Sequence, residues 1–373
     1  MSSVDTTAES HDDHHDDHHD HGEFIAHHFD SPEQQFDSGK LGIWLFLVTE
    51  VLFFSGLFVL YTLYRNYHPE IFQVAHHYLD KNLGCLNTIV LLFSSLTMAL
   101  AVRSAQTGKN KNCETYLLIT MVCATIFLGV KAVEYSHKWD LGIWPRSMFH
   151  YHEGVHETGL FGLSNYLIKL SVIPTLLLIG FAGYAAFQFL TDKANNAKFY
   201  VGMSIMVLGY FAGVLGGVVY QNAVAGDSHA HAAVQPAGPL MLHAAMLEDS
   251  HDDHGHDHSQ GEGHDEHGHD DHSHEAAGHE GDHSGDHHED VPAGSQTSVP
   301  DSVGIFFSIY YCMTGLHAIH IIGGIVALAW LYRRSQLGHW REDYFGPVDY
   351  VGLYWHLVDL IWIYLFPLLY LID

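Results

Sequence analysis

The chain has 373 residues, of which 47% are apolar, and it carries 43 acidic and 15 basic side chains with 35 histidines. Its formal net charge of −28 comes from two low-complexity segments, because residues 1–37 and 227–290 hold 11 and 17 of the acids and neither Lys nor Arg. The remainder is neutral and strongly apolar, which excludes a soluble enzyme with an acidic surface. The absence of a clustered basic face argues against nucleic-acid binding.

Seven stretches are apolar enough to cross a bilayer, whose hydrocarbon core requires about 20 helical residues. In chain order they are 41–64, 83–103, 115–137, 167–190, 199–222, 303–332 and 350–371. They are apolar on all sides, whereas the helices of a soluble bundle would alternate polar and apolar faces. The sequence therefore predicts an all-α protein, a polytopic membrane helix bundle with seven transmembrane helices.

Two local patterns predict details of the packing. Gly209, Gly213 and Gly217 recur at every fourth position of the fifth stretch, which lets another helix approach closely along one stripe. Pro174 predicts a kink or a weak point in the fourth stretch.

The four cysteines form no Cys-x-x-Cys pair, so neither a disulfide framework nor a cysteine-ligated metal site is expected. We interpret them as small residues buried within helices. They are Cys85, Cys113, Cys123 and Cys312. Residues 1–23 contain no basic region and do not resemble a signal peptide.

The basic residues predict the orientation of the chain in the membrane. With the N-terminus inside, the inner segments hold nine Lys and Arg residues and the outer loops hold four. This excess places the N-terminus in the cytoplasm, and the C-terminus and residues 227–290 on the outer side.

Several ionisable side chains fall within the predicted spans, where each would be costly if it faced lipid. They are Glu50, Lys131, Glu134, His317, His320, His356 and Asp359. The last six form three i,i+3 pairs, and Lys131 and Glu134 are expected to neutralise each other. Two interpretations remain open for the set: a path for protons or metal ions, or structural hydrogen bonds between helices.

Five spans carry motifs that occur together in one known family. They are Leu41–Phe54 with Trp44 and Thr49-Glu50-Val51-Leu52-Phe53-Phe54; Leu86-Asn87-Thr88 followed by Ser94-Ser95; Glu134-Tyr135; Thr314-Gly315-Leu316-His317-Ala318-Ile319-His320-Ile321-Ile322-Gly323-Gly324; and Tyr354-Trp355-His356-Leu357-Val358-Asp359-Leu360-Ile361-Trp362. In this order, the motifs resemble subunit III of the haem–copper respiratory oxidases, the cytochrome c oxidase subunit III family.

The resemblance implies a non-redox subunit of a proton-pumping terminal oxidase that reduces oxygen to water. Such a chain has no catalytic centre of its own and binds no haem or copper, which lie in partner subunits I and II. It would stabilise subunit I, support proton uptake, hold phospholipid and take part in any respiratory supercomplex. The residues carried over as intramembrane polar groups are Glu50, Glu134, His317, His320, His356 and Asp359.

The same resemblance suggests a lipid contact and a location. Arg333 and Arg334, at the inner end of the sixth span, are expected to meet a lipid phosphate or to act as ordinary inner-side anchors. The short five-helix form of the family points to a bacterial plasma membrane, with 227–290 and the C-terminus in the periplasm.

The sequence departs from the family pattern in that it begins like the short form and carries an insertion at about 140–300. Two extra helices in this insertion would pack on a neighbouring subunit or replace the two missing N-terminal helices. The predicted segments are a disordered cytoplasmic tail (1–38), three transmembrane helices (39–139), an inserted loop with two helices (140–226), a disordered His/Asp-rich periplasmic loop (227–300) and two final helices (301–373).

The loop 227–290 contains 16 histidines, in repeats such as His251, His254, His256 and His258. Neutral imidazole binds zinc and copper, so this loop is expected to bind or buffer transition metal. The alternatives are a solvated spacer, or a charged brush that attracts a basic partner such as cytochrome c. A transition-metal transporter or metal-buffering membrane protein is the rival to the oxidase subunit, and a purely structural assembly subunit is a third hypothesis.

Overall fold

The computed structural model describes residues 29, 31–145, 164–191, 194–232, 303–342 and 344–372. Within them the chain forms helices, turns and isolated bridge residues, among them the pair Arg341 and Tyr344, with no strand. The all-α prediction is therefore confirmed.

Seven helices in the described part of the chain are long and apolar enough to span a membrane, which confirms the predicted number. They are α1 (Pro32–Tyr67), α3 (Lys81–Gln106), α4 (Asn110–Asp140), α5 (Asn165–Leu190), α6 (Ala194–Ala232), α8 (Val303–Gln336) and α9 (Gly346–Tyr370). Two short elements, α2 (Pro69–Ala75) and η1 (His76–Tyr78), join α1 to α3. Each predicted span coincides with one long helix, and most helices extend further because backbone hydrogen bonding continues beyond the apolar stretch.

Local capping determines where several helices begin and end. The Ser31 hydroxyl accepts the backbone N–H of Gln34 at 3.2 Å at the start of α1, and Asp80 Oδ1 accepts that of Asn82 at 2.9 Å at the start of α3. Gly108 adopts a φ of 64° in the turn between α3 and α4, a conformation that favours glycine. These contacts satisfy backbone groups that helix termini leave free.

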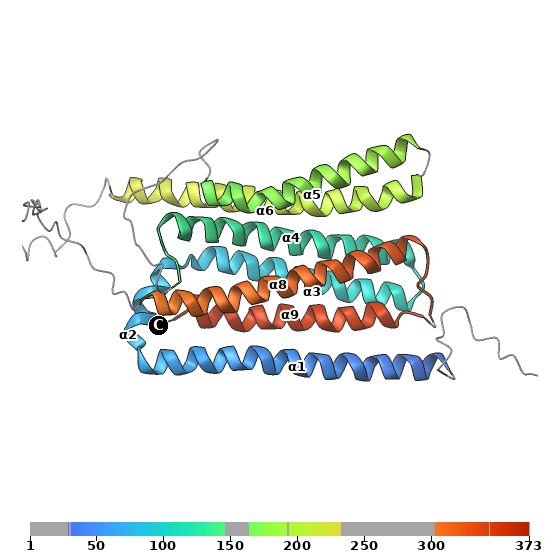
Figure 1. The fold of residues 1–373 in the computed structure, drawn as a ribbon, viewed down its shortest axis with the longest axis horizontal. Helices are drawn as coiled ribbons and strands as arrows, with labels where there is room; N and C mark the ends of the chain where they lie inside the picture. Colours follow the sequence, from blue (N-terminus) through green and yellow to red (C-terminus); the bar gives the residue numbers. More distant parts are fainter. Residues whose placement is uncertain are drawn as a thin grey trace, which may run out of the picture. The chain divides into compact units, whose positions relative to one another are not determined.

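The chain divides into two units, residues 1–221 with 299–373 and residues 222–298. The second contains the last residues of α6 and otherwise lies outside the described residues. In the first, α4 is central: 67% of its most apolar stretch is buried, against 11% for α1 and 6% for α5. α4 packs against α3, α5 and α8, and α9 packs against α1, α3 and α8, with the long helices side by side (Figure 1).

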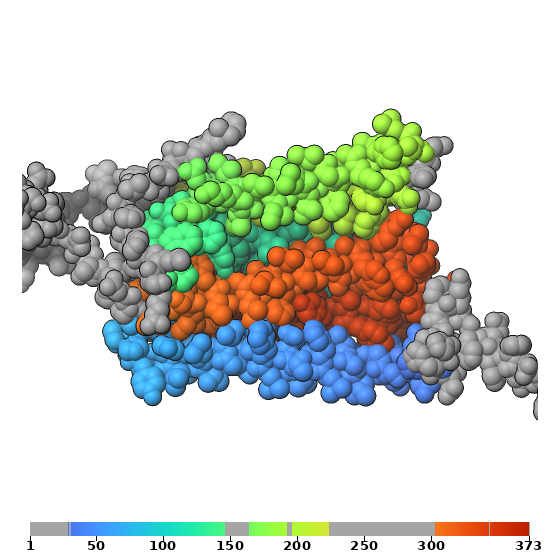
Figure 2. All heavy atoms as spheres, viewed as in Figure 1, coloured from blue at the N-terminus to red at the C-terminus, as the bar shows by residue number. Residues whose placement is uncertain are grey.

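α1 lies at the edge of this unit, and its side chains form one border of the surface in Figure 2. It contacts α9 near both ends. The Tyr61 hydroxyl donates to the carbonyl of Leu368, and the Tyr350 hydroxyl donates to that of Phe36 at 2.9 Å. α1 is thus fixed to the bundle while most of its surface remains open.

The glycine stripe of α6 packs against α4 of the same chain. A Cβ atom at Gly213 would collide with the backbone carbonyl of Ile126, and one at Gly209 would lie 2.6 Å from Thr125 Oγ1. The Thr125 hydroxyl also donates to the carbonyl of Met206 at 2.7 Å. The predicted close approach is confirmed, and α4 of the same chain makes it.

The interpretation of the cysteines as buried residues is correct for two of them and wrong for the other two. Cys113 and Cys123 of α4 are buried, whereas Cys85 of α3 and Cys312 of α8 are exposed. The difference follows from the packing, because α4 is surrounded by other helices while α3 and α8 each turn one side away from the bundle.

Candidate functional site

A group of ionisable side chains surrounds Glu134 near the end of α4. Glu134 Oε2 accepts a hydrogen bond from Lys131 Nζ at 2.8 Å, and Oε1 accepts one from Lys138 Nζ at 2.7 Å. Tyr310 of α8 and Tyr370 of α9 donate their hydroxyls to Oε1 at 2.8 and 2.6 Å. The Glu134 side chain is 2% exposed, so these bonds replace the water that burial removes. We call these five residues the Glu134 cluster.

The cluster forms because its three charged residues share one face of α4. Lys131 and Lys138 lie three residues before and four residues after Glu134, spacings that bring side chains together on a helix. Lys131 Nζ also lies 4.5 Å from the centre of the Trp362 ring, where the electron-rich face stabilises an ammonium. With all three charged groups ionised, the cluster carries one excess positive charge inside the protein.

The sequence predicted only part of this cluster. The expected contact between Lys131 and Glu134 is present, but Lys138 was overlooked although its i,i+4 spacing from Glu134 was visible. Tyr310 and Tyr370 were overlooked as well. A tyrosine inside an apolar span was the available signal, because a buried hydroxyl usually requires a hydrogen-bond partner.

A second polar contact joins α1 to α8. His320 Nε2 lies 2.9 Å from Glu50 Oε2, and His320 Nδ1 lies 2.8 Å from the carbonyl oxygen of Leu316. The two side chains are only 16% and 18% exposed. The Phe54 ring packs against the imidazole in a T-shaped arrangement, with 5.1 Å between ring centres and 63° between the ring planes.

This geometry requires a proton between Glu50 and His320. A carbonyl oxygen can only accept, so Nδ1 must donate its hydrogen to Leu316. The hydrogen bond between Nε2 and Oε2 then needs one further proton, carried either by the imidazole or by the carboxyl group. The pair therefore stores one proton that can reside on either partner.

His317 does not share this site, although it lies one turn from His320. It is fully buried, and its ring lies 5.6 Å from that of Phe127 and 5.3 Å from that of Trp362. Within the described residues neither ring nitrogen has a hydrogen-bond partner. The i,i+3 spacing of the two histidines thus does not create a shared ligand pair.

His356 and Asp359 bind adjacent serines on α3. His356 Nδ1 lies 2.6 Å from Ser95 Oγ, and Ser94 Oγ donates to Asp359 Oδ2 at 3.4 Å. Trp355 Nε1 in turn donates to Ser94 Oγ at 3.0 Å. These contacts hold α9 against α3, and they connect the residues of two sequence motifs.

The two arginines at the end of α8 occupy different environments. Arg333 Nη2 donates to Asn196 Oδ1 at 2.6 Å, and its guanidinium lies 5.5 Å from the centre of the Phe199 ring. Arg334 lies 4.8 Å from the centre of the Trp330 ring. Arg333 is therefore already bound to α6, and the expected lipid contact remains a prediction for both residues.

Among the described residues, no group of three or more His, Cys, Asp or Glu side chains converges as a metal site would require. His251, His254, His256 and His258 of the predicted metal-binding loop lie outside the described residues. The described polar groups thus form separate contacts that can hold protons and fix helices.

Comparison with known proteins gives matches to one family. The sequence model of cytochrome c oxidase subunit III matches residues 16–207 and 293–373, more than half of the chain. A cytochrome c oxidase subunit 3 of Synechocystis sp. is 42% identical over 73 residues, 19% of this chain and 31% of the relative. A probable cytochrome c oxidase subunit 3 of Mycobacterium tuberculosis is 36% identical over 76 residues, 20% of this chain and 36% of the relative.

A further relative combines two subunits in its name. A heme-copper oxidase subunit I+III of Aeropyrum pernix is 37% identical over 70 residues, which is 18% of this chain and 9% of the relative. The matched stretches thus span only about a third or less of the length of these curated relatives.

The fold and the site define a multi-pass helical membrane protein in which Glu50, Glu134 and other intramembrane ionisable groups are bound by other side chains. The chain belongs to the cytochrome c oxidase subunit III family. Between its first and last matched residues, the family model leaves only residues 208–292 unmatched. The predicted insertion is longer, from about 140 to 300. The matched part thus includes α5 and the beginning of α6, and the assignment of both helices as inserted stays a prediction.

Proposed function

We propose that this chain is the non-redox subunit III of a proton-pumping haem–copper terminal oxidase, and that it stabilises subunit I and supports proton uptake. Family membership supports this function, and the Aeropyrum pernix relative, named for subunits I and III together, supports an association with subunit I. Haem and copper would lie in subunits I and II, so this chain would hold no catalytic centre. A supercomplex would add further partners.

The observation that carries the proposal is the contact between Glu50 and His320. Both residues belong to the family motifs, and they meet across α1 and α8 from positions 270 residues apart. An ionisable pair inside the hydrocarbon is costly, which favours a functional role. Because the pair stores a proton that either partner can carry, it is suited to exchange protons with a path in subunit I.

Glu50→Gln tests this role in the assembled oxidase. The amide keeps the size of the side chain but cannot carry the exchangeable proton, so we expect assembly to be retained. Turnover is expected to fall about threefold to tenfold, which corresponds to ~1 kcal/mol on the barrier. The measurements are oxygen consumption, proton uptake and the number of turnovers before inactivation, with the haem spectrum as the measure of assembly.

Glu33→Gln is the matched control, since Glu33 is exposed in the first turn of the same helix. His320→Gln should reproduce the effect of Glu50→Gln, and the double variant should be no slower than either single variant. Unchanged uptake and lifetime in a fully assembled Glu50→Gln complex would favour the purely structural subunit. Failure of the chain to co-purify with haem-containing subunits would refute the oxidase assignment.

The proposed location is a bacterial plasma membrane, with the N-terminus in the cytoplasm and the C-terminus and loop 227–290 in the periplasm. The excess of basic residues on the proposed inner side supports this orientation. Arg334 and Arg333 lie at that side and would meet lipid phosphate, with Arg334 the less engaged within the chain.

We also propose that the loop 227–290 binds zinc or copper outside the membrane. The full-length chain should retain more Cu²⁺ or Zn²⁺ in equilibrium dialysis than a chain that lacks residues 227–290. Replacing His251, His254, His256 and His258 by Gln should lower the bound amount in part, because the remaining histidines offer further weak ligands. Equal binding with and without the loop would refute the proposal, and unchanged assembly and activity of the loopless chain in metal-poor medium would remove a physiological role.

The transporter alternative predicts a ligand cluster shared by several helices near the middle of the bilayer. The residues described by the structure provide no such cluster of three or more His, Cys, Asp or Glu. No observation on the described helices therefore favours transport over the oxidase role.

A further inference from the structure

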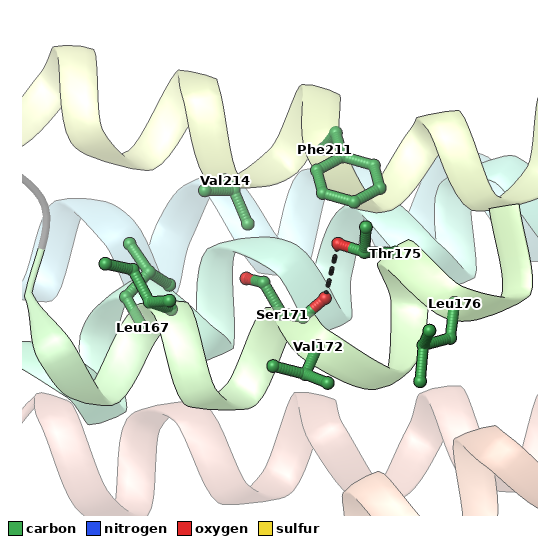
Figure 3. A pocket seen from close by; sticks show the side chains of 8 residues that line it. Leu167, Ser171, Val172, Thr175, Leu176, Phe211 and Val214 are labelled. Atoms are coloured by element: carbon green, nitrogen blue, oxygen red, sulfur yellow. Dashed lines mark hydrogen bonds between the residues drawn. The ribbon is translucent and has the colours of Figure 1, made fainter. Parts of the chain in front are cut away.

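A groove of about 320 Å³ lies between α5 and α6, away from the motif-bearing contacts described above (Figure 3). Leu167, Val172 and Leu176 of α5 form one wall, and Phe211 and Val214 of α6 form the other. Val172 and Leu176 are 48% and 64% exposed, so the groove opens toward the surroundings of the bundle. Because α5 is long and apolar enough to cross a membrane, the open side of the groove faces a region that lipid can occupy.

The polar atoms of the groove are already hydrogen bonded within the chain. Ser171 Oγ lies 3.1 Å from the hydroxyl of Tyr210, and Thr175 Oγ1 donates to the carbonyl of Ser171 at 2.7 Å, as the dashed line in Figure 3 shows. An occupant therefore does not need to supply a donor or an acceptor. This favours a hydrocarbon chain over a polar ligand.

A cationic side chain, Lys169, lies beside the groove near the N-terminal end of α5, outside the residues that line it. Lys169 shares one side of α5 with Val172 and Leu176, at spacings of three and seven residues. Its ammonium lies 5.2 Å from the centre of the Tyr166 ring. From Lys169 to Leu176 the helix rises about 10 Å, enough for the upper part of an acyl chain.

Aromatic side chains mark this end of the groove as the region of the lipid headgroups. The Trp139 and Trp144 rings stack with 5.3 Å between their centres, and the Tyr166 ring lies 5.9 and 5.6 Å from them. Tryptophan and tyrosine gather at the membrane–water interface. Tyr166 and Lys169 thus lie beside the N-terminal end of the groove, and Val172 and Leu176 follow further along α5. This arrangement complements the headgroup, phosphate and acyl chain of a phospholipid.

We propose that the groove between α5 and α6 binds one anionic phospholipid, with an acyl chain along Val172, Leu176 and Val214 and the phosphate at Lys169. The site does not depend on the proposed oxidase function, because its residues lie outside the Glu50–His320 contact and the Glu134 cluster. Lipid retention and enzymatic turnover can therefore succeed or fail separately.

The apolar part is tested by filling the groove. Val214→Phe places a ring where the acyl chain would lie, whereas Val219→Phe adds the same ring at a position on α6 that is 58% exposed and outside the groove. Native mass spectrometry of the full chain in mild detergent with phosphatidylglycerol should detect one retained lipid for the unchanged chain and for Val219→Phe. The lipid should be lost in Val214→Phe. Equal retention by both variants would overturn the site.

The charged part is tested by Lys169→Gln, an exposed change that does not depend on repacking. We expect phosphatidylglycerol affinity to fall about fivefold, the typical contribution of one Lys near a membrane surface, with phosphatidylcholine binding unchanged. Lys169→Arg should restore it, and Lys81→Gln, an exposed lysine at the start of α3, is the control. Displacement of the lipid by inorganic phosphate, equal loss in the Lys81 variant, or a partner-subunit helix cross-linked into the groove would each contradict the proposal.

Discussion

Glu134→Gln is expected to destabilise the chain by about 3–5 kcal/mol, because it leaves two buried ammonium groups without their carboxylate. Lys131 and Lys138 each bond to Glu134, and both lysines are nearly inaccessible to water, at 6% and 3% side-chain exposure. An amide can accept hydrogen bonds but does not neutralise charge. Denaturant titration of the purified chain in detergent, followed by circular dichroism, measures the effect, and little folded protein should accumulate.

The control is Glu114→Gln on the same helix. Glu114 is half-buried and accepts a bond from Gln336 Nε2 at 2.9 Å, so its replacement should cost less than about 1 kcal/mol. Replacing Lys131 and Lys138 by Met together with Glu134→Gln should recover part of the lost stability, because the unpaired charges are then removed. A loss no larger than that of Glu114→Gln would mean that water reaches the ammonium groups.

Gly213→Ala is expected to destabilise the contact between α6 and α4 by about 1–3 kcal/mol, the usual range for overpacking. The added methyl group would meet the backbone of Ile126, which cannot rotate away as a side chain could. The free energy of unfolding in detergent reports the loss, and faster proteolysis at the α5–α6 pair would report its detachment from α4.

Gly216→Ala provides a sharp control on the same helix. A Cβ at Gly216 meets no atom within 4 Å, so this change should be neutral or stabilising by up to about 1 kcal/mol, because alanine favours helices over glycine. Gly129→Ala, which meets the backbone of Tyr210 from the α4 side, should act like Gly213→Ala without adding fully to it. Equal effects of Gly213→Ala and Gly216→Ala would show that α6 does not depend on this close approach.

The sequence alone determined the number and type of the helices. A helix must be about 20 residues long and apolar to cross the hydrocarbon, and it satisfies its own backbone, so each span can be recognised without its neighbours. Contacts within one helix follow similarly from spacing, as between Lys131 and Glu134. The glycine stripe likewise predicted a close helix contact, because a missing side chain is a local property.

Only the tertiary structure decided which side chains from different helices meet. Tyr310 and Tyr370 reach Glu134 from positions 176 and 236 residues away, and His320 reaches Glu50 across 270 residues. The i,i+3 histidines were correctly placed one turn apart, yet His317 packs against Trp362 while His320 binds Glu50. Periodicity places residues around one helix axis, whereas the rotation and register of that helix against its neighbours depend on packing along its whole length.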